Sequence, residues 1–538
     1  MASGCSRTTI AAAALFMTTL AWRLLTFSGY TNDHYGSLAL AQQMLLGDLP
    51  VRDFADPGWP LTYLVSAAAW WIAGNAMWVE WAIVATALAV ASAFTVIAAH
   101  RLSGSLTIAV LVTIVQILVS PRSYAYPKIL PYAAFAALVV AGVAPSPRRL
   151  IGLGLLLALA FLLRHDHGLW LGIGALTYLT LSSVPFDART VIHRGLVVGM
   201  AAGVVLLPWL LFVSVNGGLI PYFETALEFA RAEANASMLR ALPTFTLTGG
   251  TPIAENADAW LFWLFWSLPG MAAVIVARRW RRGEEHRAGE LAAVGALVAV
   301  AAGVNAGFLR DVLRTRFADA IVPAALLGAW LLGIAYAAGW RRRGSQRVAQ
   351  LATAALFVIS MAAIASATEL RDRLERTNYN AGPAGMYRRA VEVVGVLGMP
   401  HRATPPSRVS AALMPFFEYL DRCTSESDRL IATGEYPDVV VLAGRGFGSD
   451  GAVFGAWYSS VRNQHRTLQR LRERPALFTI LLDEASFQQR FRAIAQFVDE
   501  EYRPFATLET PGIHVPILVH GQRAASRVDP ATGWPCFR

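Results

Sequence analysis

The chain has 538 residues, of which 55% are hydrophobic and only 15% are charged, and its mean hydropathy is +0.45. A soluble globular protein carries about 25% charged residues, so this composition excludes an ordinary soluble enzyme and indicates a polytopic membrane protein. The formal charge of +10 comes from arginine clusters in short loops. Such clusters are typical of topology signals, and without a basic stripe carrying interleaved aromatic residues we expect no nucleic-acid partner.

Apolar segments near the roughly 20 residues that cross a bilayer predict about eleven transmembrane helices. The first segment has no small-residue cleavage site, so we interpret it as a retained span rather than a signal peptide. The short segments 150–163 and 169–181 also fit a pair that enters the bilayer and returns. The predicted spans are 8–27, 79–99, 105–120, 129–144, 150–163, 169–181, 195–214, 259–277, 289–305, 319–339 and 348–367.

The loop 28–60 follows the first span and concentrates acidic residues in a chain that is otherwise strongly apolar. It contains Asp33, Asp48, Asp53 and Asp56. Carboxylates beside a bilayer are costly unless they face water or take part in chemistry. This loop is therefore the first candidate for an active site.

Loops that gather arginine alternate with loops that carry acids or few charges. Because positively charged loops stay in the cytoplasm, the alternation places the loop 28–60 and the whole C-terminal tail outside the cytoplasm. We expect a bacterial inner-membrane protein with this orientation. The arginine-bearing loops contain Arg101, Arg148–Arg149, Arg189–Arg194, Arg278–Arg287 and Arg341–Arg343.

Two segments have the character of interfacial helices rather than spans. Residues 61–72 are apolar and aromatic but too short to cross, and 221–242 is amphipathic, with Glu224 and Glu228 on its polar side. We expect both to lie in the plane of the membrane surface.

From about residue 370 the composition is that of a soluble domain, so we divide the chain into a membrane domain, 1–369, and an extracytoplasmic α/β domain, 370–538. Strands are predicted at 429–433, 438–443, 476–482 and 513–519, and helices at 461–474 and 484–500. The glycine-rich segment 444–448 is interpreted as a plain turn rather than a dinucleotide loop. Cys423 and Cys536 share this domain, and the sequence leaves open whether they form a disulfide.

Basic residues near the outer ends of several spans are candidates for binding an anion. Lys128 is the only lysine of the chain and precedes a span, where it could also anchor the helix at the interface. Arg164 lies between two short spans and could instead pair with Asp166. Arg314 and Arg316 lie in a loop predicted to face outward, so topology signalling does not explain them. Guanidinium groups bind phosphate in a bidentate manner and stay charged.

The histidines of segment 165–167 favour a hydrogen-bonded network over a metal site. His165 and His167 are two residues apart and do not share a helix face, and no third ligand lies near them in sequence. We therefore predict no metal ligand among the named residues.

The first loop and the order of the spans resemble the GT-C membrane glycosyltransferases, which include the protein O-mannosyltransferases and the lipid A aminoarabinose transferase. The resemblance covers about residues 8–340. It rests on a first span that ends in a carboxylate at Asp33, the run GDLPVRDF at 47–54, the Asp56-Pro57 entry to a juxtamembrane helix, and a late span that starts at Arg316. It implies a GT-C-like helical fold with an outward C-terminal domain. The implied activity is transfer of a sugar from a polyprenyl-phosphate carrier to a glycan, lipid or protein acceptor outside the membrane.

An inverting transfer of this kind needs one carboxylate base to take the proton of the acceptor hydroxyl, while a phosphate leaves as a stable anion without a general acid. The resemblance makes Asp33 the candidate base, although Asp33 could also cap the following helix. Asp53, Asp56 and His34 are candidates for substrate binding, but Asp53 could pair with Arg52 and Asp56 could be a turn residue. Relatives often carry two adjacent acids where this chain has Asn32-Asp33-His34. No cofactor is predicted with certainty, and a divalent cation, Mg²⁺ or Mn²⁺, stays open.

Three other classes were weighed. A transporter or flippase of lipid-linked sugars would share the spans and the outward arginines, but no inverted repeat with broken helices is visible. An envelope glycan ligase or polymerase would place its key residues in a late outward loop, whereas here the acids come first. A receptor would need far fewer spans as an anchor.

Overall fold

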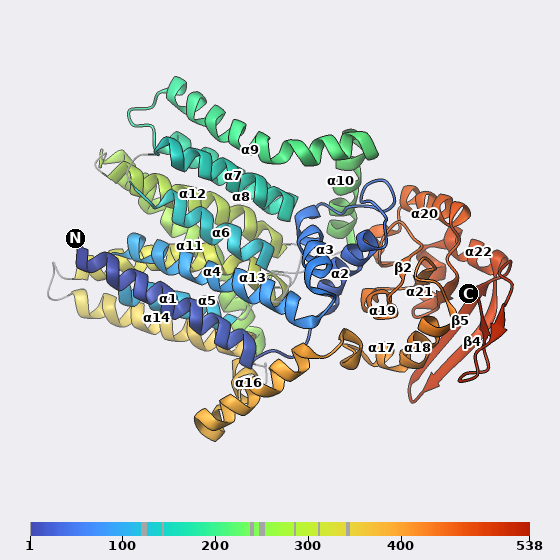
Figure 1. Ribbon diagram of the computed structural model, residues 1–538. Helices are drawn as coiled ribbons and strands as arrows, with labels where there is room; N and C mark the ends of the chain where they lie inside the picture. The colour runs from blue at the N-terminus through green and yellow to red at the C-terminus, as the bar shows by residue number, and fades with distance from the viewer. Residues whose placement is uncertain are drawn as a thin grey trace. The chain divides into compact units, whose positions relative to one another are not determined.

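The computed structural model describes residues 2–119, 126–142, 145–236, 242–246, 253–284, 287–309, 313–339 and 345–538. The chain forms two compact units. The helical unit comprises Met1–Phe27, Trp81–Trp209 and Ser237–Val394, and the mixed unit comprises Ser28–Glu80, Leu210–Ala236 and Gly395–Arg538 (Figure 1).

The helical unit is built from long apolar helices, and each predicted span coincides with one of them. They are α1 (Ala2–Leu25), α4 (Met77–Ser103), α5 (Leu106–Val119), α6 (Tyr126–Val139), α7 (Pro147–Leu163), α8 (His165–Leu181), α9 (Ala188–Asn216), α11 (Ile253–Arg281), α12 (Ala288–Ala306), α13 (Leu313–Gly339) and α14 (Ser345–Ala367), followed by α15 (Leu370–Arg376) and α16 (Gly382–Gly398). Among the described residues, 6 helices are long and apolar enough to cross a membrane, and several apolar helices are shorter. The protein is therefore a multi-pass helical membrane protein, while the number of spans stays a prediction.

Small residues allow the helices of this unit to approach closely, as is typical of packing in membranes. A Cβ added at Gly154 of α7 would lie 2.3 Å from the backbone oxygen of Val198 in α9. A Cβ at Gly174 of α8 would lie 2.5 Å from the side chain of Val300 in α12. The interior also satisfies its polar groups, since the fully buried Trp330 donates its indole N–H to Glu290 at 2.7 Å.

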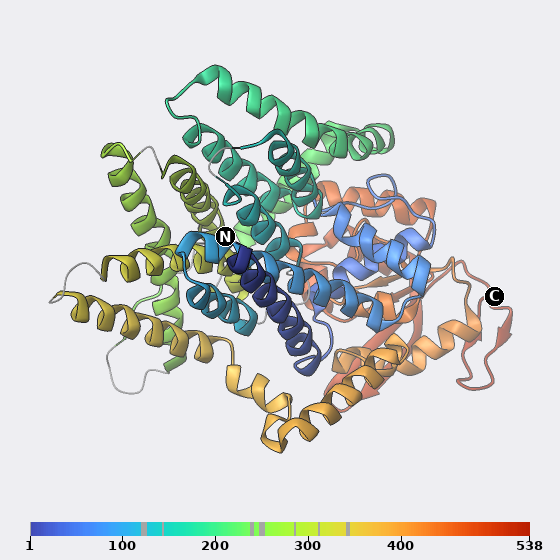
Figure 2. The same ribbon diagram turned by 60° about the vertical axis from the view of Figure 1, so that its left-hand side comes forward.

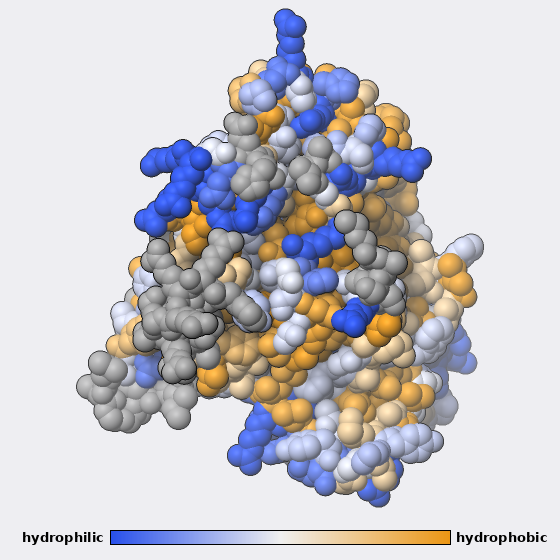
Figure 3. All heavy atoms as spheres, turned by 90° about the vertical axis from the view of Figure 1, so that its left-hand side faces the viewer, coloured by the Kyte–Doolittle hydropathy of each residue, from blue (hydrophilic) through white to orange (hydrophobic). Residues whose placement is uncertain are grey.

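The outer faces of the helices carry apolar side chains that nothing in the described unit covers. On α9 these residues recur every three or four positions, which is one face of a helix. Hydrophobic residues also dominate large parts of the side of this unit that faces the viewer in Figure 3. A bilayer is the environment that such a face requires. The exposed apolar residues of α9 include Ile192, Leu196, Met200, Val204 and Leu207.

The mixed unit combines helices that follow the first span with an α/β fold from the C-terminal part. Its helices are α2 (Asn32–Leu45), α3 (Pro60–Ala73), α10 (Leu219–Ala236), α17 (Arg408–Ala412), α18 (Met414–Cys423), α19 (Pro437–Ala443), α20 (Val461–Glu473), α21 (Glu484–Arg490) and α22 (Arg492–Glu501). Its strands are β1 (Arg429–Ala432), β2 (Gly446–Phe447), β3 (Phe478–Ile480), β4 (Tyr502–Thr510), β5 (Ile513–His520), β6 (Arg527–Val528) and β7 (Pro535–Cys536).

Five of these strands form one mixed sheet in the order β2-β1-β3-β5-β4. β1 pairs in parallel with β2 and β3, whereas β5 runs antiparallel to β3 and β4. The predicted strands at 429–433, 476–482 and 513–519 are confirmed as β1, β3 and β5. The α/β character predicted for the C-terminal part is therefore confirmed.

The strand predicted at 438–443 is wrong, because these residues form the helix α19. Pro437 occupies the first turn, where its missing N–H costs nothing, and Gly444 ends the helix in a left-handed conformation with φ of 65°. All residues of α19 are buried, so its run of valines reflects burial on every side rather than a strand. The helix predicted at 484–500 is broken at Phe491 into α21 and α22.

The acidic first loop packs on the C-terminal fold within the mixed unit, and Figures 1 and 2 both show α2 and α3 beside it. The Gln42 side chain donates to the carbonyls of Val440 and Arg445 at 3.0 and 2.9 Å. Gln43 exchanges hydrogen bonds with the backbone of Phe447 at 3.1 and 2.9 Å. The predicted division into two domains at residue 370 stays a prediction. The two compact units show which residues pack together, and they do not show which part of the chain folds or acts independently.

A disulfide joins Cys423, at the end of α18, to Cys536 in β7. The question that the sequence left open is thereby answered. The two cysteines are 113 residues apart and both are fully buried. The bridge fastens the end of the chain to the rest of the mixed unit.

Candidate functional site

A cluster of charged side chains lies inside the helical unit, where α6, α8 and α13 contribute their first turns. At its centre the Lys128 ammonium binds the Asp319 carboxylate at 2.7 Å, and the two side chains are only 3% and 7% exposed. Lys128 therefore does not reach outward as an interfacial anchor. Asp319 is 191 positions away in the chain, and sequence reasoning missed it.

Two arginines complete the cationic side of this cluster. Arg316 lies one turn before Asp319 on α13 and reaches its carboxylate at 3.6 Å. Arg164, at the junction of α7 and α8, binds both oxygens of Asp166 at 2.9 and 3.0 Å. Both guanidiniums interact electrostatically with Lys128. The structure thus brings together three basic residues that the sequence selected separately.

The remaining polar groups of the cluster form the hydrogen-bonded network that was predicted for segment 165–167. His167 is hydrogen-bonded to the buried Tyr132 hydroxyl and lies 3.7 Å from Asp166. The ring of His165 stacks on Phe161, with 4.1 Å between the ring centres. We refer below to these seven residues as the charged cluster: Lys128, Tyr132, Arg164, Asp166, His167, Arg316 and Asp319.

The charged cluster gathers three cations, Lys128, Arg164 and Arg316, around the carboxylates of Asp166 and Asp319. Charges at membrane depth are expensive and mark functional sites, and guanidinium and ammonium groups are the side chains that bind phosphate. The side chain of Arg314 and all of Arg310 lie outside the described residues.

Asp33 is exposed in the first turn of α2, in the mixed unit. Thr31 occupies the N-cap position of α2 without a side-chain capping hydrogen bond, and Asp33 lies in the first turn. A second acid, Glu435, lies near it, and the Asn32 side chain binds the Glu435 carbonyl. Burial first, and then the charge of Asp33, raise the pKa of Glu435 above its ordinary value. Sequence reasoning missed Glu435, which comes from the distant loop after β1.

His34 turns away from its neighbour Asp33 and is buried. It lies 3.2 Å from the Glu80 carboxylate and stacks on the ring of Tyr30 at 4.3 Å. The Ser66 hydroxyl donates to the same Glu80 oxygen at 3.2 Å. These contacts give His34 a structural role within the mixed unit. Its role in substrate binding stays a prediction.

Asp53 and Asp48 are held by arginines. Asp53 accepts hydrogen bonds from Arg52 and from the Leu49 N–H at 2.7 Å. Partial burial acts in the opposite direction, but these bonds hold the pKa of Asp53 below its ordinary value. Asp48 is buried and binds Arg429 at 3.1 Å and Arg470 at 2.5 Å. Both contacts fix the shape of the first loop.

Asp56 is 2% exposed and forms the turn that leads into α3. One oxygen accepts the N–H groups of Gly58 and Trp59 at 2.9 and 3.3 Å, and the other accepts the Tyr222 hydroxyl at 2.7 Å. Burial raises the pKa of Asp56 to about 6, although these hydrogen bonds act against the increase. Asp56 therefore has the turn role predicted as one alternative. Its carboxyl group differs from that of an exposed aspartate in its burial and its raised pKa.

Potential metal ligands are sparse. Within the described residues no group of three or more His, Cys, Asp or Glu side chains is arranged to hold a metal ion. Asp33 with Glu435 could supply two carboxylates, and Mg²⁺ is often bound by one or two carboxylates plus water and substrate phosphate.

No family model matches the sequence, and no curated protein matches it. Among solved structures, ArnT from Cupriavidus metallidurans bound to undecaprenyl phosphate is similar over 98% of this chain and 100% of that chain, with 13% identity and a TM-score of 0.47. The Archaeoglobus fulgidus oligosaccharyltransferase, tethered with an acceptor peptide, is similar over 94% of this chain and 74% of that chain, with 11% identity and a TM-score of 0.47. At this identity and TM-score neither carries a function or a site residue over to this chain.

Proposed function

We propose that the protein is an inverting glycosyltransferase, a hexosyl- or pentosyltransferase, of a bacterial inner membrane. It moves a sugar from a polyprenyl-phosphate carrier to a cell-envelope acceptor, which is a glycan, lipid or protein, on the outer face. The observation that carries the proposal is the charged cluster, which brings Lys128, Arg164 and Arg316 together inside the helical unit.

The charged cluster suits a lipid phosphate for two reasons. Its guanidiniums and ammonium are the groups that bind phosphate oxygens best. Its carboxylates hold the cations in place without a ligand, since Asp319 contacts both Lys128 and Arg316. As the bond to the sugar breaks, charge grows on the phosphate, and preorganised cations stabilise that charge. Lys128, Arg164 and Arg316 are assigned to this role, and Arg314 is kept as a further candidate.

Proton removal is assigned to Asp33. The acceptor oxygen attacks the anomeric carbon, the bond from that carbon to the phosphate oxygen breaks with its electron pair, and the acceptor proton passes to the carboxylate. Asp33 is exposed and thus open to a substrate. Its neighbour Glu435 supplies the second acid that the sequence lacks beside Asp33.

Two features support an extracytoplasmic position for the C-terminal part. The alternation of arginine-bearing loops places it outside, and the Cys423–Cys536 disulfide suits an oxidising compartment. Asp33 shares the mixed unit with this disulfide, so the proposed chemistry takes place on the outer side.

The test is transfer of radiolabelled sugar from a panel of polyprenyl-phosphate sugars in proteoliposomes, by wild type, Asp33→Asn and Arg316→Gln. We expect Asp33→Asn to bind undecaprenyl phosphate normally but to lose transfer by a factor of about 10²–10⁴. We expect Arg316→Gln to lose both binding and transfer. Runs with EDTA, and with Mg²⁺ or Mn²⁺ restored, decide whether a divalent cation is required.

Equal transfer by wild type and Asp33→Asn would show that Asp33 is not the catalytic base. Asp53 and Asp56 would then be the next candidates for the base. Movement of labelled lipid between leaflets without any transfer would replace the enzyme by a transporter or flippase. Joining of preassembled glycans would indicate a ligase or polymerase.

A further inference from the structure

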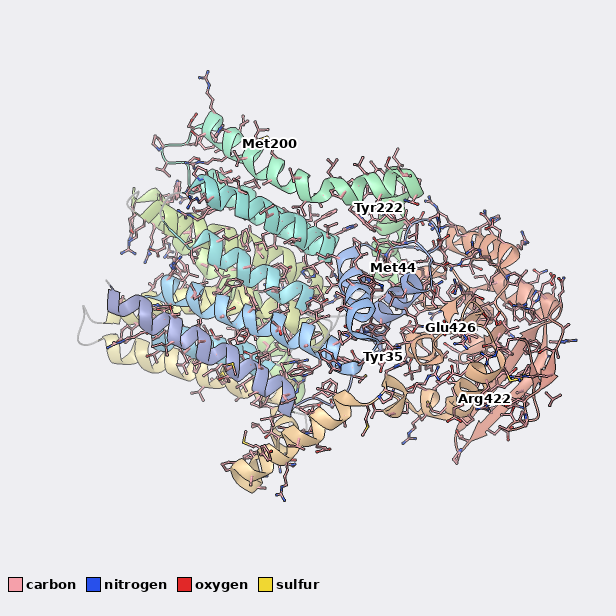
Figure 4. All side chains as sticks on the ribbon, in the orientation of Figure 1. Tyr35, Met44, Met200, Tyr222, Arg422 and Glu426 are labelled. Atoms are coloured by element: carbon pink, nitrogen blue, oxygen red, sulfur yellow. A yellow bond between two sulfur atoms is a disulfide. The ribbon has the colours of Figure 1, made fainter. Side chains whose placement is uncertain are left out.

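A second polar group of side chains lies in the mixed unit, apart from Asp33. We refer to Asp56, Tyr63, Tyr222, Asp450 and Tyr458 as the acid–tyrosine cluster. Tyr222 projects from α10, where it is labelled in Figure 4, and binds Asp56. The backbone joins the two acids as well, since the Ala55 N–H donates to the Asp450 carbonyl at 2.8 Å.

The two carboxylates act on the same phenol. Burial first, then the charge of Asp450 and the charge of Asp56, raise the pKa of Tyr458 above its ordinary value. Tyr63 interacts electrostatically with Asp56, Tyr222 and Tyr458. These electrostatic interactions and the Tyr222–Asp56 hydrogen bond show that the five side chains lie near one another.

Two buried polar atoms of the acid–tyrosine cluster lack a hydrogen-bond partner in the part of the chain that the structure describes. Tyr63 is 0% exposed and its hydroxyl is unpaired. Asp450 is 5% exposed; one of its oxygens lies 3.1 Å from Arg466, and the other is unpaired. A buried polar group without a partner costs about 1–3 kcal/mol and is uncommon in native proteins. Both atoms therefore point to a ligand with hydroxyl groups.

Aromatic rings border this cluster. We refer to Trp59, Phe229, Trp457 and Tyr458 as the aromatic border. The Phe229 ring centre lies 5.5 Å from Trp59, 6.2 Å from Trp457 and 5.8 Å from Tyr458. All four are half-buried, so part of each side chain stays in contact with solvent.

The aromatic border is held in place by close packing. A Cβ on Gly455 would lie 2.6 Å from the Trp457 ring, so the indole rests directly on the backbone there. Arg462 of α20 also contacts Glu224 and Glu228 of α10 at 3.0 and 3.4 Å. The rings are thus preorganised, which lowers the entropy cost of binding.

The chemistry of this region matches a neutral saccharide. Ionised carboxylates only accept hydrogen bonds, which sugar hydroxyls donate, and a tyrosine hydroxyl both donates and accepts. Apolar rings with a few polar groups are the usual lining of a small-molecule site, and the rings suit the C–H face of a pyranose or furanose. Two carboxylates repel a phosphate, so the carrier lipid is the ligand of the charged cluster and not of this one.

We propose that the acid–tyrosine cluster and the aromatic border bind the saccharide part of the acceptor. That this saccharide is the acceptor rests on the proposed function; that the region binds a neutral saccharide does not. The assignment gives Asp56 a role in acceptor recognition in addition to its role in the turn.

The test is saccharide binding to the full-length protein in nanodiscs, followed by saturation-transfer NMR. The probes are mannobiose, cellobiose, lactose and arabinobiose. We expect Trp457→Ala to weaken binding of the preferred probe at least tenfold. Tyr63→Phe removes only the unpaired hydroxyl, so it is expected to weaken binding while thermal stability is kept or increased. Trp71→Ala is the matched control, because Trp71 is 80% exposed on α3 of the same unit.

The inference is overturned if wild type binds none of the four probes. It is also overturned if Trp457→Ala and Tyr63→Phe both bind the preferred probe as tightly as wild type does. Lys128→Met alters only the charged cluster, so the two proposals together expect it to lose sugar transfer and to keep saccharide binding. If wild type transfers no sugar but still binds a saccharide, the proposed function fails and the binding site remains. If transfer occurs without saccharide binding at Trp457, the site fails alone.

Discussion

At the scale of single residues, the Lys128–Asp319 ion pair allows a structural role of Lys128 to be separated from its proposed role in ligand binding. Breaking a buried ion pair from one side leaves an uncompensated charge and costs about 3–5 kcal/mol, whereas replacing both partners by apolar residues is often neutral. We expect Lys128→Met to lower the thermal stability strongly and Lys128→Met with Asp319→Leu to restore it. Neither variant should bind undecaprenyl phosphate, measured by native mass spectrometry.

Arg371→Ala provides the control for that experiment, because its side chain is 90% exposed and pairs with Glu375 one turn away. An exposed pair contributes little, so neither stability nor lipid binding should change. Recovery of lipid binding in the double variant would mean that Lys128 has a structural role only.

Asp56 should make the stability of the mixed unit depend on pH. Its pKa is about 6 in the folded protein, against 3.8 in the unfolded chain. Between these values the folded state binds more protons, so stability falls as the pH rises from about 4 to 6 and the loss is complete above that range. A difference of about 2 pKa units corresponds to about 3 kcal/mol.

Asp56→Asn removes this titration, and its amide oxygen can still accept the Gly58 and Trp59 N–H groups while its NH2 group donates to the Tyr222 oxygen. We expect the variant to gain thermal stability relative to wild type at pH 8 and to lose that advantage at pH 4, measured by melting in detergent. A constant difference between the two proteins across this pH range would contradict the assigned titration.

At the scale of elements, close helix contacts depend on single glycines. A Cβ at Gly154 of α7 would meet backbone atoms of α9, which cannot turn aside, whereas a Cβ at Gly152 of the same helix would meet only the Leu138 side chain at an ordinary 3.7 Å. We expect Gly154→Ala to destabilise the protein by about 1–3 kcal/mol. Gly152→Ala should be neutral or slightly stabilising, because alanine favours helix. Melting temperatures of the two variants in one detergent compare them directly.

The same scale shows what the sequence could predict. Apolar length was sufficient to locate the long helices of the helical unit, because a helix satisfies its own backbone and needs no partner to be recognised. Hydropathy also located Lys128, Arg164 and Arg316 at the ends of spans. It could not pair Lys128 with Asp319, because that contact depends on how α6 and α13 pack.

The local sequence pattern did not predict the correct element where a segment is buried on every side. It also did not predict contacts between residues that are distant in the sequence. Val439–Val441 fits a buried strand as well as a buried helix, and only the flanking Pro437 and Gly444 distinguish the two. Glu435 gives no local signal that it lies near Asp33. Asp450 and Tyr63 likewise become notable only through the hydrogen bonds that they lack.

At the scale of the whole molecule, the proposed function depends on which side of the membrane each part occupies. The arginine-bearing loops and the disulfide give the same orientation, but by independent physics: one through charge during insertion, the other through the redox state of a compartment. An error in orientation would place Asp33 and the acid–tyrosine cluster on the cytoplasmic side. Orientation is thus the most general test of the proposal.

Single cysteines report this orientation in a background where Cys5 is replaced by serine and the Cys423–Cys536 bridge is kept. Gln488 on α21 and Arg282 after α11 are both exposed. In intact spheroplasts we expect a membrane-impermeant maleimide to label Gln488→Cys, and to label Arg282→Cys only after permeabilisation. Labelling of Arg282→Cys without permeabilisation would reverse the orientation. The donor sugar and its acceptor would then have to be sought in the cytoplasm, where the disulfide would not be expected to persist.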